Sequence, residues 1–234
     1  MRAAAWIFPL LAGIVLAGCT QPGDGNPGGN GPGPTTSPPP AFDCSAASFR
    51  LGDVNITFDT SAGAITAVLY GAQSPETVCN FLRYVEDDFY DDTVWHRICA
   101  GFVIQAGGLD ALGQSAPARE PIRNEGPDSQ LRNWKGTIAM ARTAEPDSAT
   151  THFFVNLVDN LRLDFDGTYA PGYAVFGNVT GGWDVVEAIA DTPVVPSTPP
   201  PPSQLPPLGL PLGGCEGRPI PTMETTILDV RVES

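Results

Sequence analysis

The chain has 234 residues, of which 26 are acidic and 12 are basic, so its formal net charge is −14. This charge excludes a general nucleic-acid binder, because that role needs clustered lysine and arginine, and the chain has one lysine, Lys135. Hydrophobic residues make up 42%, too many for a wholly disordered chain, and the length suits one ordinary domain. Of the 25 prolines, seven lie in residues 21–40 and eleven in 193–221, so two low-complexity stretches flank or interrupt the folded part.

The first residues are typical of a signal peptide. Met1-Arg2 precede an uncharged run, residues 3–17, which is too short to span a bilayer but fits the apolar region of such a peptide. The run ends in Leu16-Ala17-Gly18-Cys19, which resembles a bacterial lipobox. We therefore expect residues 1–18 to be removed and Cys19 to carry the lipid; the alternative is an ordinary signal peptide with Cys19 incidental. Because Thr20 and not Asp follows the cysteine, we expect anchoring in the cell envelope at the outer membrane, facing the periplasm.

Residues 19–43 are rich in glycine and proline and have no apolar periodicity. Glycine keeps such a segment flexible and proline keeps it extended, which predicts a tether between membrane and domain. The domain itself is expected over residues 44–234.

Four further cysteines, an even number in an oxidising compartment, predict two disulfides. They are Cys44, Cys79, Cys99 and Cys215. Four cysteines allow three pairings. If the first and last strands are neighbours, Cys44–Cys215 closes the domain and leaves Cys79–Cys99. No CxxC is present, which argues against a zinc ribbon or a thiol oxidoreductase, and we expect no metal and no cofactor.

The folded part begins with a predicted hairpin. Residues 54–58 alternate apolar and polar side chains, 61–63 form a turn, and 65–69 resume the spacing. A helix then starts at Ser74, the expected N-cap, followed by Pro75 at its first position, and its apolar stripe continues to Val85.

Short apolar runs follow, separated by loops rich in Gly, Asp, Asn and Pro. These runs are 102–104, 137–140, 153–155 and 173–176, and a second helix is predicted over 183–190. Many short strands with two helices predict a mainly β fold, a closed antiparallel barrel with the helices capping its ends.

One segment, residues 95–108 (WHRICAGFVIQAGG), resembles the signature of the cyclophilins, the peptidyl-prolyl cis-trans isomerases. The resemblance is to the bacterial branch of that family, and it continues in order through further segments. These are Asn124-Glu125, 131–133, 136–143, 147–150, 153–156 and 172–177. It implies an eight-stranded closed β-barrel capped by two α-helices and an enzyme that accelerates rotation about X-Pro bonds in exported proteins. It is interrupted by residues 193–221, which we interpret as a proline-rich insertion.

The resemblance also implies a site. Catalysis is assigned to Arg97, Phe102 and Gln105. Substrate binding is assigned to Val103, Ala141, Arg142, His152, Phe154, Leu163 and Tyr173. Arg97 suits the chemistry, because a fixed cation near the prolyl nitrogen stabilises the twisted amide and no covalent step is needed. From periodicity alone, Phe102 and Phe154 are equally well core residues.

Three positions depart from the family pattern. Val103 stands where many relatives carry Met, His152 where the family usually has Gln, and Arg162 where animal cyclophilins place a Trp. The competing interpretation is a binding module or chaperone on the same fold that holds proline segments with little turnover. In either case we expect a monomer whose partners are proline-containing, partly folded exported proteins.

Overall fold

The computed structural model describes residues 52–168, 170–196, 217–219 and 225–233. The predictions for the signal peptide, Cys19, the tether, Cys44 and Cys215 lie outside these residues.

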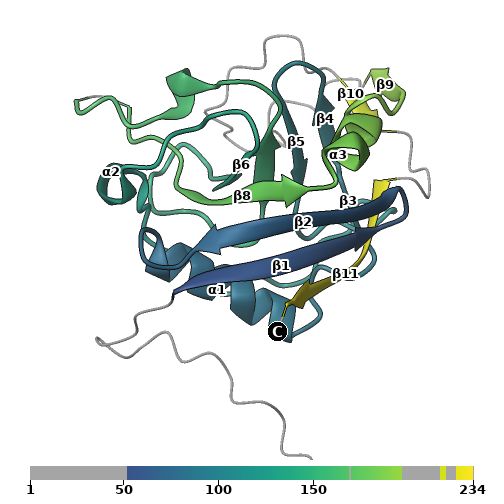
Figure 1. The fold of residues 1–234 in the computed structure, drawn as a ribbon, viewed down its shortest axis with the longest axis horizontal. Coiled ribbons are helices and arrows are strands. Elements are labelled where there is room, and N and C mark those ends of the chain that lie inside the picture. The colour runs from purple at the N-terminus through teal and green to yellow at the C-terminus, as the bar shows by residue number, and fades with distance from the viewer. Residues whose placement is uncertain (1–51, 169, 197–216, 220–224, 234) are drawn as a thin grey trace, which may run out of the picture. The chain divides into compact units, whose positions relative to one another are not determined.

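A nine-stranded antiparallel sheet forms the framework of the domain (Figure 1). Its strands are β1 (Asp53–Thr60), β2 (Gly63–Tyr70), β3 (Thr93–Val94), β4 (Arg97–Cys99), β5 (Val103–Ala106), β6 (Thr137–Met140), β7 (Phe153–Asn156), β8 (Val175–Gly181) and β11 (Thr226–Val232). Their order across the sheet is β3-β11-β1-β2-β8-β6-β7-β5-β4.

A short connection between the two edge strands makes this sheet curl. The strands at its two ends, β3 and β4, are separated in sequence by Trp95 and His96 alone, so the two edges must lie close together. The mainly β fold, a curled antiparallel sheet with helices, is therefore confirmed. The sheet has nine strands where eight were predicted. Two of them lie within residues 93–99 and pair with strands near opposite ends of the sheet.

The predicted hairpin is confirmed as β1 and β2, which pair from Asp53–Tyr70 to Thr60–Gly63. Strand β11 then pairs with β1, so the first and last strands are neighbours, as the disulfide prediction required. Strand β5 begins at Val103 and not at Phe102, because Phe102 belongs to the tight turn after β4, where its N–H donates to Cys99 O at 2.9 Å.

A mostly aromatic core fills the inside of the sheet. Phe153 contacts several other rings, with centroids 5.6 Å from Phe58, 5.5 Å from Phe81 and 5.7 Å from Trp95. Helix α1 (Pro75–Glu86) contributes Phe81, and the later helix α3 (Trp183–Ala190) buries Val186 and Ile189 against the same cluster. Both predicted helices are confirmed, and in Figure 1 α1 lies beneath β1 and β2.

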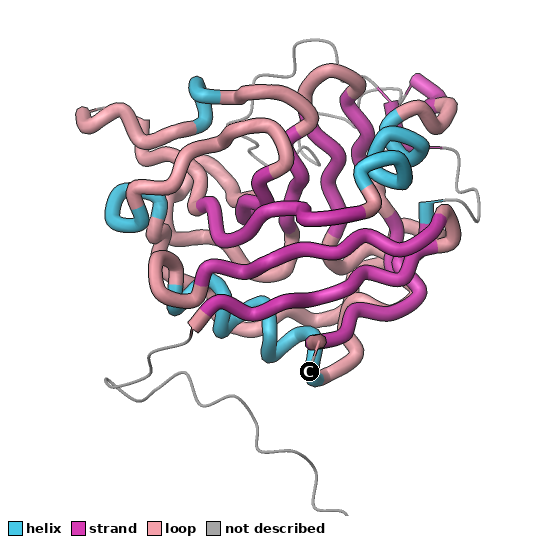
Figure 2. Tube along the Cα trace, viewed as in Figure 1, coloured by secondary structure: helices cyan, strands magenta, loops and turns pink. Residues whose placement is uncertain are grey.

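Loops make up most of the chain between β5 and β6 and between β7 and β8 (Figure 2). The helical elements among their described residues are a four-residue helix, α2 (Gly126–Ser129), and a 3-10 turn, η1 (Leu161–Leu163). Among the described residues, no helix has both the length and the apolar character needed to cross a membrane.

Both ends of the predicted insertion pair with each other. Strand β9 (Val194–Pro196) and strand β10 (Gly217–Pro219) form a separate two-stranded antiparallel ladder. The chain therefore leaves and returns at one place, and β10 lies beside β4. The intervening residues 197–216 lie outside the described residues.

Cys79 of α1 and Cys99 of β4 are both disulfide-bonded. Because Cys44 and Cys215 are not among the described residues, the predicted pairing stays a prediction.

The start of α1 corrects one sequence prediction. Ser74 occupies the N-cap position but makes no capping bond; its hydroxyl instead donates to Val175 O at 2.7 Å. The free N–H groups of the first turn are satisfied by Glu125, whose carboxylate accepts from Glu76 N at 3.2 Å and Thr77 N at 2.8 Å. It also accepts from the Thr77 hydroxyl at 2.7 Å. A buried carboxylate 48 positions away in the chain thus caps the helix.

We predict that Glu125→Ala lowers the free energy of unfolding by about 2–4 kcal/mol, because it leaves buried donors without an acceptor. Urea denaturation followed by circular dichroism measures this. The matched control is Glu120→Ala, which removes an exposed carboxylate and is expected to change stability by less than about 0.5 kcal/mol. Equal, small effects in both variants would show that Glu125 does not hold the helix.

Candidate active site

Strand pairing places the polar and aromatic candidates in one row. Arg97 pairs with Gln105, and Gln105 in turn pairs with Phe154. The row continues through Ala139 to Val175. Directly paired residues share a face of a sheet, so these five side chains project to the same side.

The alternate residues of the same strands face the other way. Ile98, Ile104, Val155 and Ile138 belong to the aromatic core. Since successive residues of a strand point to opposite faces, the alternation separates a core face from a site face. The site face carries a second apolar cluster of its own. Its members are Cys99, Phe102, Val103, Ala139, Ala141, Phe154, Leu163, Tyr173 and Val175.

Arg97 and Gln105 form the polar edge of this second cluster. The Arg97 Nη1 donates to Gln105 Oε1 at 3.2 Å. Its Nη2 is buried and, within the described part of the chain, has no hydrogen-bond partner. Burial lowers the pKa of Arg97, an effect that Tyr173 opposes, but guanidinium keeps its charge. The side chain therefore holds unused donors beside an apolar surface.

Aromatic rings form the middle of the cluster. Phe154 and Tyr173 meet edge to face, with centroids 5.8 Å apart, and Phe102 is 5% exposed. An apolar cluster of this kind suits contact with a small ring such as that of proline.

Two arginines lie on these rings from the outside. The Arg142 Cζ is 4.4 Å from the centroid of Tyr173, and the Arg162 Cζ is 4.5 Å from that of Phe102. Arg142 is also held by two carbonyls, donating from Nε to Gly172 O at 3.0 Å and from Nη1 to Thr143 O at 2.9 Å.

The loop that carries Leu163 and Tyr173 folds back on itself through Tyr173 N, which donates to Leu163 O at 2.9 Å. Gly172 makes this close return feasible: its φ is +71°, and an added Cβ would lie 2.5 Å from Phe165 N. A side chain at this position would push the two halves of the loop apart.

Buried amides fix the same loop to the sheet, and sequence reasoning missed them. Asn160 Nδ2 donates to Phe102 O at 3.0 Å and to Asn156 Oδ1 at 2.8 Å. Asp164 Oδ1 accepts from Asn133 N at 2.7 Å and from its side-chain amide at 3.0 Å. The available signal was a set of Asn and Asp residues in the segments beside predicted strands, a pattern that ordinary loops share.

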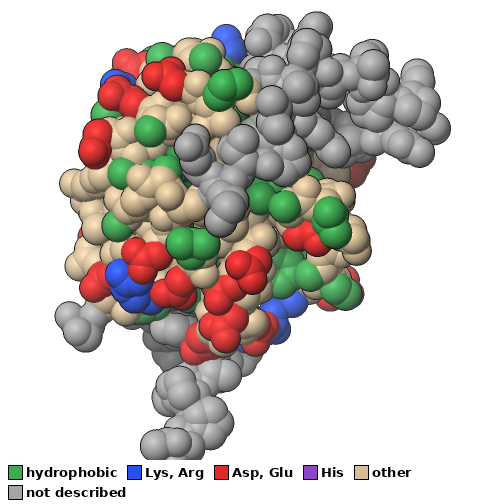
Figure 3. All heavy atoms as spheres, turned by 90° about the vertical axis from the view of Figure 1, so that its right-hand side faces the viewer, with side chains coloured by type: hydrophobic (Ala, Val, Ile, Leu, Met, Phe, Trp, Pro, Cys, Tyr) green, Lys and Arg blue, Asp and Glu red, His purple; other side chains and the backbone are tan. Residues whose placement is uncertain are grey.

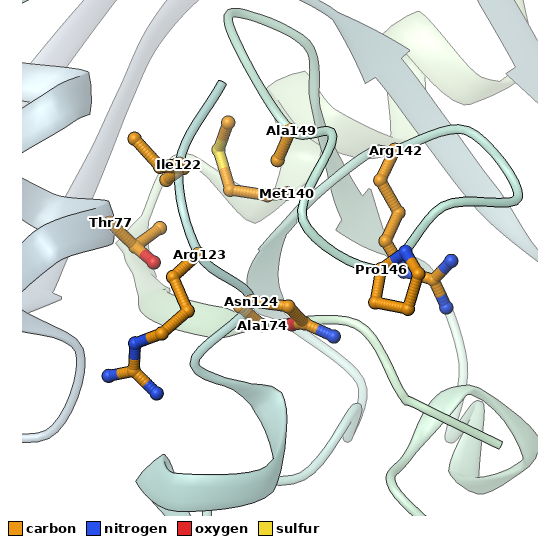
Figure 4. A pocket seen from close by; sticks show the side chains of 9 residues that line it. All are labelled: Thr77, Ile122, Arg123, Asn124, Met140, Arg142, Pro146, Ala149 and Ala174. Atoms are coloured by element: carbon orange, nitrogen blue, oxygen red, sulfur yellow. The ribbon is translucent and has the colours of Figure 1, made fainter. Parts of the chain in front are cut away.

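A second segment supports the backbone at Ala141 and Arg142. Ala141 N donates to His152 O at 2.8 Å. The loop that follows packs over a small pocket lined by Thr77, Ile122, Arg123, Asn124, Met140, Arg142, Pro146, Ala149 and Ala174 (Figure 4). In that view Arg123 and Arg142 lie at opposite sides of the pocket. Ile122 N donates to Ala149 O of this loop at 3.0 Å.

The chain's two histidines meet beside Arg97. The rings of His96 and His152 have centroids 4.9 Å apart and an interplanar angle of 57°. Burial lowers the pKa of His152 below its ordinary value of 6.5, so the imidazole is neutral at neutral pH.

All ten predicted site residues thus come together in this region. Six belong to the second apolar cluster, Arg97 and Gln105 border it, Arg142 covers Tyr173, and His152 pairs with Ala141 through its backbone. The fold therefore brings an apolar cluster together with a bonded arginine and glutamine at its edge.

Comparison with known proteins identifies the family. Residues 54–205 match the family model "Cyclophilin type peptidyl-prolyl cis-trans isomerase/CLD". The Escherichia coli (strain K12) peptidyl-prolyl cis-trans isomerase B is 45% identical over 136 residues, covering 57% of this chain and 82% of that protein. A Streptomyces antibioticus peptidyl-prolyl cis-trans isomerase is 47% identical over 136 residues, covering 57% of this chain and 81% of the Streptomyces protein.

A solved structure agrees in fold. The Cryptosporidium parvum cyclophilin type peptidyl-prolyl cis-trans isomerase, crystallised in the presence of dipeptide ala-pro, superposes with a TM-score of 0.58 at 18% identity. The match covers 77% of this chain and 99% of that one. The chain belongs to the cyclophilin-type peptidyl-prolyl cis-trans isomerases. It is accordingly an enzyme of that activity and not merely a binding module.

The buried His152 predicts a dependence of stability on pH. The unfolded chain binds a proton on this imidazole near pH 6.5, whereas the folded protein binds it only at lower pH. The unfolding free energy is therefore unaffected by protonation of His152 above about pH 6.5 and decreases as the pH falls below that value. Between about pH 7.5 and about pH 5.5, the unfolding free energy of wild type should fall more steeply than that of His152→Gln, by at most about 1.4 kcal/mol per pH unit.

Urea denaturation of both proteins at the two pH values measures the difference, and carboxylates common to both cancel in the comparison. Parallel pH dependences in the two proteins would contradict the assignment to His152.

Proposed function

We propose that this isomerase acts on exported proteins from a lipid-anchored position in the bacterial cell envelope, and that the cluster around Arg97 is its catalytic centre. The lipobox-like sequence ending at Cys19 supports the location. The disulfide bonds of Cys79 and Cys99 support it independently, because disulfides persist in oxidising compartments such as the periplasm. The outer membrane is favoured by Thr20, and the protein works as a monomer on proline-containing segments.

The chemistry follows from the amide bond. Rotation about the C–N bond has a barrier of about 18–20 kcal/mol because resonance must be broken. As the bond twists, the prolyl nitrogen becomes pyramidal and gains a lone pair. A donor placed at that nitrogen interacts with the twisted state more strongly than with either planar isomer, which is the condition for acceleration.

Arg97 supplies that donor. Its bond to Gln105 fixes the guanidinium, and the unused Nη2 leaves hydrogen-bonding capacity for a substrate. Because Gln105 accepts through its carbonyl oxygen, its amide group is oriented to donate to a substrate carbonyl. The two side chains thus hold one side of the X-Pro bond while the other side turns.

The apolar cluster holds the proline ring. Phe102, Phe154 and Leu163 are nearly or fully buried side chains from separate segments, which makes the surface rigid. The backbone at Ala141 and Arg142 holds the extended peptide. Ring burial alone does not identify the residue before proline, so many X-Pro sequences are accepted.

The observation that carries the catalytic assignment is the buried, unused donor of Arg97 beside Gln105. We predict that Arg97→Ala lowers kcat/KM for a proline tetrapeptide by about 10²–10³, the usual effect of removing one preorganised donor. Exchange NMR of the cis and trans signals measures the rate. The matched control, Arg231→Ala, removes an ion-paired arginine of β11 and should keep the wild-type rate.

Unchanged circular dichroism and urea midpoints establish that Arg97→Ala is folded. Equal rates in wild type and folded Arg97→Ala would overturn the catalytic role of this side chain.

The envelope location has its own test. The full chain, expressed in a Gram-negative host, should partition into the detergent phase of Triton X-114 and incorporate labelled palmitate. Cys19→Ser should abolish both, because it removes the acylated thiol, whereas Thr20→Ala should retain both. A wild-type protein that stays in the aqueous phase would disprove lipid anchoring and leave the isomerase assignment intact.

A further inference from the structure

The arginines of the described residues differ in their partners. Arg119, Arg123, Arg132 and Arg231 each have a carboxylate within 4.0 Å. Three others, Arg97, Arg142 and Arg162, have no such partner among the described residues. In a chain with 26 acidic and 12 basic residues, arginines without a carboxylate partner call for an explanation.

These three arginines border the same apolar cluster. Arg162 lies over Phe102 and Arg142 over Tyr173, while Arg97 is bonded to Gln105, which pairs with Phe154 of the cluster. Phe102 and Tyr173 belong to one cluster of buried residues. The positive charges therefore stand around the surface on which the proline ring is expected to rest.

Arg162 differs from the other two arginines in its hydrogen bonds. Arg97 is bonded to Gln105, and Arg142 is bonded to two backbone carbonyls. Arg162 is exposed and, among the described residues, makes a ring contact but no hydrogen bond. Its planar guanidinium thus keeps its donors available at the rim of the cluster.

We propose that Arg162, together with Arg142, forms a subsite for a carboxylate side chain next to the proline of a substrate. This proposal rests on the proposed function, because it takes the cluster as the substrate groove. A carboxylate that reaches Arg162 beside the Phe102 ring can form a charge-assisted hydrogen bond with a guanidinium that has no carboxylate partner among the described residues.

Because of the protein's negative net charge, we expect the subsite to favour substrates with a single acidic residue over long acidic segments. Acidic side chains are widespread and basic ones sparse on the face shown in Figure 3, and the whole chain carries −14. A long acidic segment would meet repulsion from this surface, whereas a single Asp or Glu beside proline meets the local arginines within the screening length of about 8 Å. The preferred substrate is therefore a peptide with one acidic residue flanking proline.

Two pairs of proline tetrapeptides test the proposal. One pair differs by Glu or Gln just before proline, and the other by Glu or Gln just after it. Exchange NMR gives kcat/KM without a coupling protease, whose own specificity would interfere. For wild type at low salt, the Glu peptide of at least one pair should be turned over about threefold to fivefold faster than its Gln partner, as expected for an accessible ion pair.

Arg162→Gln should bring this ratio to one while leaving the rate on the Gln peptides within about twofold of wild type, because only the charge pair is removed. Arg162→Lys keeps the charge and should retain part of the preference. Arg231→Gln makes the same charge change far along the chain and should retain all of it, since Arg231 already has carboxylate partners.

Several results would overturn the subsite. They are a wild-type ratio of one in both pairs, a ratio that survives Arg162→Gln, and a loss in Arg162→Gln that is equal for Glu and Gln peptides. The last result would mean that Arg162 only supports Phe102. No turnover of any peptide by wild type would instead refute the isomerase site itself, so the two failures are distinguishable.

Discussion

The antiparallel pairing of β4, β5, β7 and β6 is the constraint on which the site depends. It aligns Arg97, Gln105, Phe154 and Ala139 across four strands, although they come from distant parts of the chain. Because a shift of one residue would turn every side chain to the opposite face, the register also protects the core. The same alternation that places Ile104 and Val155 in the aromatic interior therefore turns the candidate site residues to the other face of the sheet. Core and site are two results of one pairing pattern.

Hydrogen bonds of buried polar groups fix the loops that surround this face of the sheet. Glu125 ties the loop before α2 to the start of α1. Asn160 ties the loop after β7 to the turn that carries Phe102, and Asp164 ties it to Asn133. A buried donor or acceptor without a partner costs about 1–3 kcal/mol, so each bond strongly favours one loop position. The aromatic surface can then be preorganised even though few of its residues lie in long strands.

How far the sequence predicted this arrangement depends on the range of the interactions. The alternation of 65–69 and the helical stripe of α1 are local, and both elements were predicted closely. The cap of α1 was not, because the local pattern pointed to Ser74 while the carboxylate comes from Glu125. Periodicity also left Phe154 undecided between core and site. Its placement came from family resemblance, and strand pairing then explains it in physical terms.

The split of residues 93–99 into two strands shows the same limit. No local pattern indicates that Thr93–Val94 pairs with β11 while Arg97–Cys99 pairs with β5. The division follows from closing a curled sheet with a short connection, which is a property of the whole chain. The buried amides were missed for a related reason, since Asn133 and Asn160 resemble loop residues until their partners are known.

The distribution of charge on the fold affects which substrates the proposed site favours. An excess of 14 negative charges disfavours the approach of polyanions, and the field of such a surface extends about one Debye length into solution. At shorter range the proposed subsite acts through the arginines on Phe102 and Tyr173, because a carboxylate in contact with a guanidinium meets a positive charge that has no carboxylate partner among the described residues. A segment approaching the groove is thus selected twice: a strongly acidic chain is repelled at a distance, and a single carboxylate beside proline is attracted on contact. In this proposal the arginines give the enzyme a preference that its apolar cluster, which accepts many X-Pro sequences, does not supply.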